Sequence, residues 1–269
     1  MHSSLPDALT AAVDEVLASA GVRHVAHGES DPVEAAAAAA GDSSALAMIG
    51  PYRSADVAEA VEATAPAGLP LLAPVATWAG VTRDDEPGCE DAARHRGTVL
   101  RMVARDTVVA QRISILVQNA GHRALVVGGD HDYGRQLDAQ LSLAGLPRAE
   151  DPGEADVVVL AGLADEPEIA RAAGLAPLPV IAFDGVQGAQ LGARREVHLA
   201  LPFPPGIDQA RRAAELVVTA LKGGALQRAT LLAELRRLGP FDDHGDPIDP
   251  PVWLWRARDD WMLEPGEAI

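Results

Sequence analysis

Residues 47–82, AMIGPYRSADVAEAVEATAPAGLPLLAPVATWAGVT, decide how this sequence folds. A short apolar run ends at Ile49 in a Gly-Pro turn, a helix is predicted over residues 55–65, and a second apolar run ends near Ala73. Strands separated by helices predict right-handed crossovers and a parallel sheet. In such sheets ligands bind at the carboxyl ends of the strands, where backbone amides and helix N-termini point toward them.

The rest of the chain continues this alternation of helices and strands. Apolar residues recur at helical spacing over residues 5–20, and Asp31 followed by Pro32 predicts an N-cap and first turn of an alanine-rich helix. Further helices are predicted over residues 107–120, 134–144, 166–173, 208–221 and 229–238. Further strands are predicted over residues 22–27, 124–127, 157–160, 180–183 and 197–201. After residue 239 the sequence predicts a turn and an antiparallel hairpin.

Composition narrows the classes of partner. The chain has 269 residues, of which 48% are hydrophobic, enough for one large domain or two lobes with separate cores. A formal net charge of −17 argues against nucleic acid and against an anionic membrane surface. No apolar run reaches the roughly 18 residues that a membrane-spanning helix needs. The single cysteine, Cys89, lies in an acidic loop that disfavours a reactive thiolate, so we interpret it as a bystander.

The N-terminal sequence MHSSLPDALTAAVDEV bears on location. It has neither the basic segment nor the apolar segment of a secretory signal, and there is no lipobox cysteine. As written, the chain is therefore expected in the cytoplasm, and in the periplasm or outside the cell if a leader precedes it.

Several stretches resemble the type I periplasmic solute-binding proteins of the leucine/isoleucine/valine-binding kind, which serve branched-chain amino acid ABC transporters. They are residues 47–82, LRMVARD at 100–106, FDDHGDP at 241–247 and VWLWRARDDW at 252–261. The resemblance implies a two-lobed α/β fold in which helices flank parallel sheets. It implies a first lobe of residues 1–104 and 206–238 and a second lobe of residues 105–205 and 239–269.

The resemblance also assigns residues to a carboxylate site in the first lobe. Ser54 matches the serine that binds the ligand carboxylate, and Ala76 and Thr77 match the alanine and threonine that complete that site. A hydroxyl at a helix N-terminus suits a carboxylate, because free amides and the helix dipole favour negative charge there. Ser54 as a simple N-cap, and the turn at 76–77 as an ordinary strand-to-helix turn, are the alternatives. Val75 stands where a smaller residue is common and is expected to narrow the site.

In the second lobe the resemblance assigns Tyr133 as the side chain that closes over the ligand and Asp184 as the partner of the ligand ammonium. Local packing of Tyr133 and a turn role for Asp184 are the alternatives. An aromatic residue that the family has near residues 163–164 is absent, which puts a standard branched-chain amino acid in doubt. Tyr52 and Trp78 are possible replacement walls, or are simply packed.

The N-terminus departs from this family. The chain is expected to begin at the first helix and to lack the strand that opens the family's first sheet, as if truncated at the N-terminus. We therefore predict that residues 22–27 and 45–49 pair directly in a four-stranded sheet. A dimer that shares an edge, or a lost N-terminal segment, are the alternatives.

No motif indicates a catalytic residue, a metal site or a cofactor. His24 and His27 lack further ligands, the GGDHD loop lacks the spacing and lysine of a phosphate loop, and DDHGD lacks the glutamate of a calcium loop. The sequence therefore predicts a protein that is not an enzyme and that closes two lobes around a small amino acid or amide. An ABC permease or a regulatory protein is a possible partner, so the role is transport or sensing. The alternatives are a cytoplasmic α/β enzyme acting on a small polar metabolite and a degenerate, non-binding paralogue.

Overall fold

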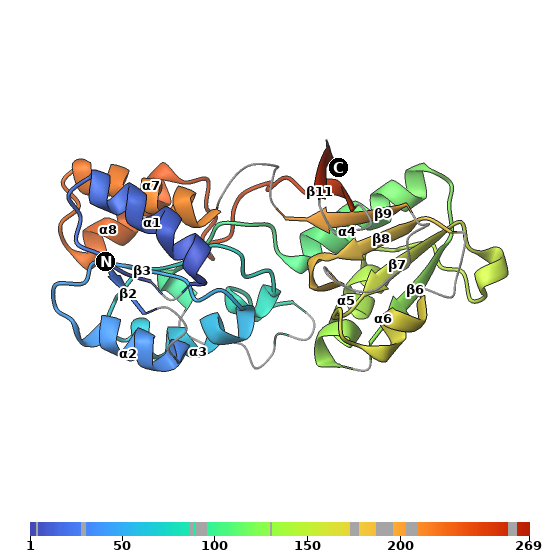
Figure 1. The fold of residues 1–269 in the computed structure, drawn as a ribbon, viewed down its shortest axis with the longest axis horizontal. Coiled ribbons are helices and arrows are strands. Elements are labelled where there is room, and N and C mark those ends of the chain that lie inside the picture. Colours follow the sequence, from blue (N-terminus) through green and yellow to red (C-terminus); the bar gives the residue numbers. More distant parts are fainter. Residues whose placement is uncertain are drawn as a thin grey trace. The chain divides into compact units, whose positions relative to one another are not determined.

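The computed structural model describes residues 1–3, 5–27, 31–86, 89, 96–129, 131–172, 178–186, 196–202, 209–257 and 263–269. The chain divides into two compact units, each α/β with its own sheet (Figure 1). Unit 1 comprises Met1–Arg105 and Gly206–Pro250, and unit 2 comprises Asp106–Pro205 and Pro251–Ile269. Within the described residues, no helix combines the length and apolar character that crossing a membrane requires.

The sheet of unit 1 is parallel throughout and has the order β2-β1-β3-β4-β5. Its strands are β1 (His2–Ser3), β2 (Val25–Ala26), β3 (Met48–Ile49), β4 (Leu71–Ala73) and β5 (Val99–Arg101). Its helices are α1 (Asp7–Ser19), α2 (Pro32–Gly41), α3 (Ser54–Thr64), α7 (Gln209–Lys222) and α8 (Arg228–Leu238).

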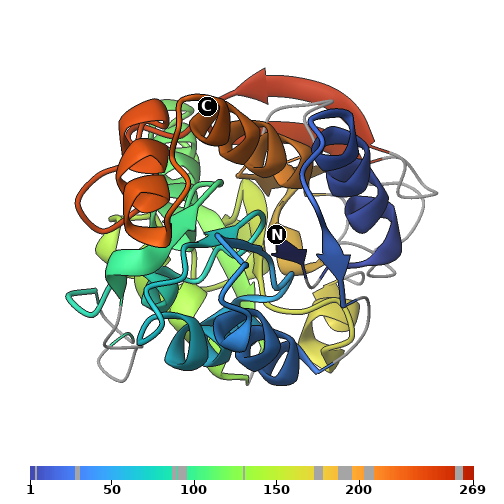
Figure 2. The ribbon, with the colours of Figure 1, turned by 90° about the vertical axis from the view of Figure 1, so that its left-hand side faces the viewer.

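Helices cover both faces of this sheet. Successive residues of a strand point to opposite faces, so each strand contributes side chains to both helix layers. One set of strand residues packs into the core with α1, α7 and α8: Ile49, Leu72 and Leu100. The other set packs with α2 and α3: Met48, Leu71 and Val99. Figure 2 shows α1, α7 and α8 on one side of the sheet, α2 and α3 on the other, and the N-terminus between these layers.

Local sequence signals account for the helix ends. Gly21 follows α1 with a φ of 69°, a left-handed conformation that glycine adopts without strain. Asp31 accepts hydrogen bonds from the backbone amides of Val33 and Glu34 at 2.8 and 3.2 Å, and Pro32 is the first residue of α2. The predicted cap of the alanine-rich helix is thus confirmed.

The sheet of unit 2 has the order β11-β10-β9-β8-β7-β6. Its strands are β6 (Ala124–Gly128), β7 (Val157–Ala161), β8 (Val180–Phe183), β9 (Val197–Leu201), β10 (Trp253–Ala257) and β11 (Leu263–Ala268). Strands β6 to β9 are parallel, and β10 and β11 form the predicted antiparallel hairpin at one edge. The helices are α4 (Asp106–Asn119), α5 (Asp132–Leu143) and α6 (Pro167–Ala172). Helix α6 shares a core with alternate residues of β7, β8 and β9, and α4 packs against α5.

Two short strands differ from the sequence-based expectation. Residues His2 and Ser3 form β1 between β2 and β3, so the predicted direct pairing of those two strands in a four-stranded sheet is wrong. This central position satisfies backbone groups on both sides of a strand of only two residues. Strand β5 was not predicted: the sequence placed a crossing between lobes near residues 101–106, whereas Arg101 is the last residue of β5, at the sheet edge.

The last crossing between the units also lies later than expected. Residues 239–250 cluster with unit 1, whereas the sequence placed everything after residue 239 in the second lobe. The cause is a hairpin, closed by a bridge between Phe241 and Pro247, whose Asp246 is bonded to side chains of unit 1.

Candidate functional site

Ser54 joins the two turns that follow β3 and β4 in unit 1. It is the first residue of α3, and its Oγ accepts hydrogen bonds from the backbone amides of Thr77 and Trp78 at 3.1 and 3.2 Å. Arg53 occupies the N-cap position, so the alternative of Ser54 as an ordinary N-cap is not what the structure shows. Two donors occupy the oxygen lone pairs of Ser54, which leaves its hydroxyl proton to donate to an acceptor.

The other residues predicted for the carboxylate site in unit 1 differ in burial. Ala76 and Thr77 are buried, and Val75 is half-buried at the end of the turn after β4. Tyr52 is 46% exposed, so it is not held in the core. The indole of Trp78 lies over Gly80, where an added Cβ would come within 2.3 Å of the ring, and it packs against the α2–α3 core.

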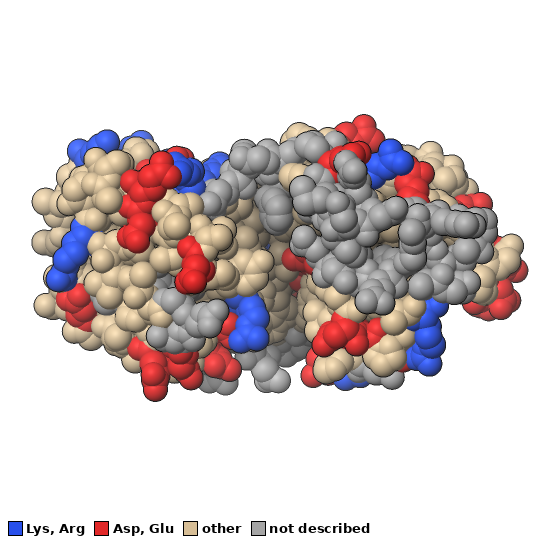
Figure 3. All heavy atoms as spheres, viewed as in Figure 1, with Lys and Arg blue, Asp and Glu red and all other residues tan. Residues whose placement is uncertain are grey.

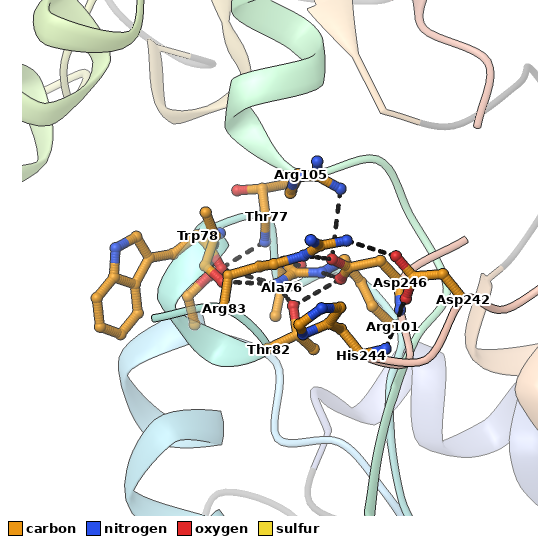
Figure 4. A network of polar contacts seen from close by, with 12 residues as sticks. Ala76, Thr77, Trp78, Thr82, Arg83, Arg101, Arg105, Asp242, His244 and Asp246 are labelled. Atoms are coloured by element: carbon orange, nitrogen blue, oxygen red, sulfur yellow. Dashed lines mark hydrogen bonds and ion pairs between the residues drawn. The ribbon is translucent and has the colours of Figure 1, made fainter. Parts of the chain in front are cut away.

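A buried ionic network lies beneath the turn at residues 76–79 (Figure 4). Arg101 is fully buried and donates to the carbonyl oxygens of Ala76 at 2.5 Å, Trp78 at 2.9 Å and Ala79 at 3.4 Å. Its Nε donates to Oδ1 of Asp246 at 2.9 Å. The same turn therefore has its carbonyls bound by Arg101 and its amides bound by Ser54.

Asp246 is the shared acceptor of this network. It is 1% exposed and accepts from Arg83, Arg101, Arg105 and Thr82. Burial by itself would raise the pKa of Asp246, but the charge of Arg101 and the hydrogen bonds from Thr82, Arg83 and Arg101 outweigh it and hold the pKa below its ordinary value.

Unit 2 brings three chemically complementary side chains together. Tyr133 is the second residue of α5, Asp184 follows β8 directly, and Asp106 is the first residue of α4. The Tyr133 hydroxyl lies 3.3 Å from Oδ1 of Asp184 and 3.5 Å from Oδ1 of Asp106. One phenolic proton can serve only one of these carboxylates fully, so the group favours a positively charged neighbour.

Asp184 has a perturbed protonation equilibrium. Burial raises the pKa of its carboxyl, and the hydrogen bonds donated by the Gly185 amide and the Tyr133 hydroxyl lower it by less. A group that is costly to keep charged in the protein alone gains from a cationic partner.

A third acid lies at the carboxyl ends of β6 and β7. Glu166 is 3% exposed, and its Oε2 accepts from the Leu163 amide at 2.9 Å. An added Cβ would lie 1.9 Å from Oε2 at Gly129 and 2.2 Å at Gly162, so these two glycines make room for the carboxylate. Within the described residues, its Oε1 has no hydrogen-bond partner.

Of the residues that the sequence analysis proposed for a site, Ser54 and Thr77 lie in the first cluster, and Tyr133 and Asp184 lie in the second. The sequence analysis did not assign Asp106, Glu166, Arg101 or Asp246 to a site. Arg101 and Asp106 belong to LRMVARD, which was interpreted only as a crossing between lobes, and Asp246 belongs to FDDHGDP, which was interpreted only as a turn. A signal was available for Asp106, because an acid at the first position of a helix that begins at a sheet's carboxyl edge is a candidate site residue.

Surface charge and metal chemistry add little to this site. Figure 3 shows acidic side chains on both units and basic side chains scattered singly among them on that face. Among the residues that the structure describes, no group of three or more His, Cys, Asp or Glu could hold a metal ion. His24, considered above for metal binding, pairs instead with Asp14.

Solved structures provide the comparison. A substrate-binding protein of an ABC transporter from Desulfitobacterium hafniense, in complex with Leu, superposes with a TM-score of 0.76 at 20% identity, over 100% of this chain and 99% of that one. The branched-chain amino acid transporter substrate-binding protein LivJ from Streptococcus pneumoniae, in complex with isoleucine, gives 0.74 at 17% identity, over 100% and 98%. The chain has the type I periplasmic-binding-protein fold.

A more distant neighbour has the same fold. A solute-binding protein of an ABC transporter from R. palustris, in complex with benzoate, gives a TM-score of 0.71 at 12% identity, over 100% of this chain and 96% of that one. No family model matches the sequence, and no curated protein sequence matches it. At these identities the likeness shows the fold, and it leaves the ligand of this periplasmic-binding-protein-like chain to be argued from its own residues.

Proposed function

We propose that this protein is a binding protein whose two units act as lobes that close around a small ligand carrying a carboxylate and an amine. The observation that carries the proposal is the position of Ser54, whose Oγ accepts the amides of Thr77 and Trp78 at the start of α3. A serine with both lone pairs occupied presents a proton at a helix N-terminus, and that combination favours an anion.

The acids of unit 2 supply the complementary charge. Asp184 and Asp106 both lie beside the Tyr133 hydroxyl, and burial raises the pKa of Asp184. An ammonium group would stabilise these carboxylates in their charged form. The solved structures with this fold were obtained with Leu, isoleucine and benzoate, all of which are carboxylates and two of which also carry an amine.

Calorimetric titration with a small panel tests the proposal. The panel contains L-leucine, L-isoleucine, L-leucinamide, which lacks the carboxylate, and benzoate, which lacks the amine and carries an aromatic ring instead of an aliphatic side chain. We expect binding of at least one amino acid, weaker binding of the amide and of benzoate, and no turnover of the bound compound by chromatography.

Two variants connect the binding to the site. Asp184→Asn should weaken an amino acid more than benzoate, because benzoate has no amine. Asp165→Asn, an exposed acid on the loop after β7, is the matched control and should leave both affinities unchanged. Conversion of the added compound to a product would indicate an enzyme, and absence of binding to every member of the panel would contradict the proposal.

A further inference from the structure

We propose that Arg101 and Asp246 are positioning residues that hold the turn at residues 76–79 in its anion-binding conformation. This inference rests on the proposed function of that turn. It extends the site by residues that need not touch the ligand and that come from β5 and from the hairpin at residues 241–247.

The argument begins with the peptide plane between Ala76 and Thr77. In a trans peptide the carbonyl and the following amide point in opposite directions. The carbonyl of Ala76 accepts from Arg101 at 2.5 Å, and the amide of Thr77 donates to Ser54 at 3.1 Å. The plane is therefore bound on both sides, and the interaction with Arg101 fixes the direction in which the Thr77 amide points.

Two further carbonyls of the turn, those of Trp78 and Ala79, lie near the same guanidinium. Arg101 Nη2 donates to the Trp78 oxygen at 2.9 Å and lies 3.4 Å from the Ala79 oxygen. The planar fork of an arginine can bind several carbonyls at once in a fixed geometry, and the ammonium of a lysine cannot reproduce that arrangement. Arg101 thus binds the carbonyl before Thr77 and the carbonyl of Trp78, and Ser54 accepts the amides of Thr77 and Trp78 between them.

Asp246 balances the buried positive charge of Arg101. Arg101 is 0% exposed, and an unpaired charge at that depth would be strongly destabilising. Oδ1 of Asp246 accepts from Arg101 at 2.9 Å and from Thr82 at 2.6 Å, while Thr82 itself accepts from Arg101 at 2.8 Å. The three side chains form a closed triangle of hydrogen bonds directly below the turn (Figure 4).

The hairpin that carries Asp246 is docked by its backbone. The Arg101 amide donates to the Gly245 carbonyl at 2.8 Å, and Gly245 has a φ of 89°. An added Cβ at Gly245 would lie 2.0 Å from the carbonyl oxygen of Val99, so only glycine permits this approach. The amide of Asp246 donates to the Asp242 carboxylate at 3.0 Å, which orients the residue before it meets Arg101.

Amide hydrogen exchange in the ligand-free protein, measured by NMR, tests the positioning directly. Arg101→Lys should raise the exchange rates of the Thr77 and Trp78 amides by roughly tenfold or more, because the hydrogen bonds from Arg101 to the carbonyls of Ala76 and Trp78, on either side of these amides, are lost. Arg83→Lys is the matched control: Arg83 also bonds Asp246 but bonds no carbonyl of the turn in the described residues, so those two amides should exchange as in the wild type.

A second variant serves if Arg101→Lys does not fold. Thr82→Val keeps the volume and the buried position but removes the hydroxyl that joins Arg101 to Asp246, so it should raise the same exchange rates in the same direction by a smaller factor. Unchanged exchange at Thr77 and Trp78 in the folded variants would overturn the inference.

A binding readout separates positioning from a general loss of stability. In wild-type protein L-leucine should bind more tightly than L-leucinamide, and Arg101→Lys should reduce that ratio by roughly tenfold while the affinity for L-leucinamide changes little. An equal loss for both compounds would overturn the inference. If the wild type binds neither compound, the proposed function fails, and the exchange rates still decide whether Arg101 orders the turn.

Discussion

Asp184 is the residue that we propose as the partner of the ligand's amine. A desolvated, charge-assisted hydrogen bond contributes on the order of 1.5–3 kcal/mol, so Asp184→Asn should weaken an amine-bearing ligand roughly tenfold to a hundredfold. Calorimetry with the tightest-binding amino acid of the panel provides the measurement. Because burial raises the pKa of this acid, the neutral variant should unfold at an equal or higher urea concentration at pH 7. An unchanged affinity would remove Asp184 from the site.

The raised pKa of Asp184 also predicts a pH dependence with a definite sign. An acid whose pKa is raised in the folded protein is protonated at pH values where the unfolded chain would be charged, so its charging opposes folding as the pH rises. Binding an ammonium requires the carboxylate, and binding should therefore release protons. We expect the dissociation constant to increase as the pH falls toward about 4. The contribution of Asp184 to this pH dependence should be lost in Asp184→Asn, and a dependence identical in both proteins would contradict the assignment.

Tyr133 is expected to limit escape of the ligand rather than its entry. Its hydroxyl lies near both Asp184 and Asp106, and its ring is close enough to Gly185 that an added Cβ there would come within 3.1 Å of it. Tyr133→Ala should raise the dissociation rate constant more than it lowers the association rate constant, as interface truncations generally do. Stopped-flow fluorescence with L-leucine measures both constants, and Tyr133→Phe separates the hydroxyl from the ring. Equal effects on both constants would argue against a closing role.

At the scale of elements, the sequence predicted the long helices and most of the strands but not β1 or β5. In α1 and α4, apolar residues recur with a period of 3.6 residues over several turns. Both helices could therefore be predicted from the sequence without knowing their tertiary contacts. By contrast, β1 has two residues without apolar alternation, and it exists because β2 and β3 pair with it on both sides. Strand β5 contains a charged residue, Arg101, whose burial depends on a partner 145 residues away.

The candidate site also contains some residues that the sequence indicated and others that only the fold brings there. Ser54 and Asp184 follow apolar strands, and the resemblance to a family motif is what singled them out as candidate site residues. The contribution of Asp246 arises only when the hairpin docks against β5, so no local pattern could have indicated it. Buried ion pairs between distant segments are consequences of the fold, and a single sequence gives no access to them.

The position of β1 leads to a prediction about unit 1. A variant that lacks residues 1–3 would leave the facing edges of β2 and β3 unpaired, and open edges of this kind pair with other chains. Each unpaired backbone group that stays buried costs roughly 1–3 kcal/mol. We expect a lower urea midpoint and self-association in sedimentation experiments. A control variant that lacks residues 267–269, on the edge strand β11, should stay monomeric if the wild type is monomeric. Unchanged stability without residues 1–3 would show that β1 contributes little to the sheet.

At the scale of the whole molecule, the acidic character favours ligands and partners that are not polyanions. The formal net charge is −17, and its acids include Asp106 and Asp184 beside Tyr133 and Glu166 at the carboxyl ends of β6 and β7. The proposed ligand has a cationic group for these acids and an anionic group for the Ser54 hydroxyl at the N-terminus of α3 in unit 1. A ligand with both charges gains from two units that each hold one of them, because binding then favours the conformation in which both contacts form.

Closure of the two units around such a ligand makes a prediction for the shape of the protein in solution. The chain passes from one unit to the other three times, at residues 105–106, 205–206 and 250–251. Domain closure of this kind turns on a few residues that connect the domains. Saturating L-leucine, or whichever amino acid of the panel binds most tightly, should reduce the radius of gyration in small-angle scattering.

A ligand that contacts only one unit has no differential affinity for a closed state, so benzoate should produce a smaller contraction than an amino acid does. Asp184→Asn keeps the carboxylate half-site but lacks the partner of the amine, and it should likewise contract less at saturation. Equal radii with and without saturating amino acid would show that the protein binds as a rigid body, and would contradict the two-lobe closing mechanism without excluding binding itself.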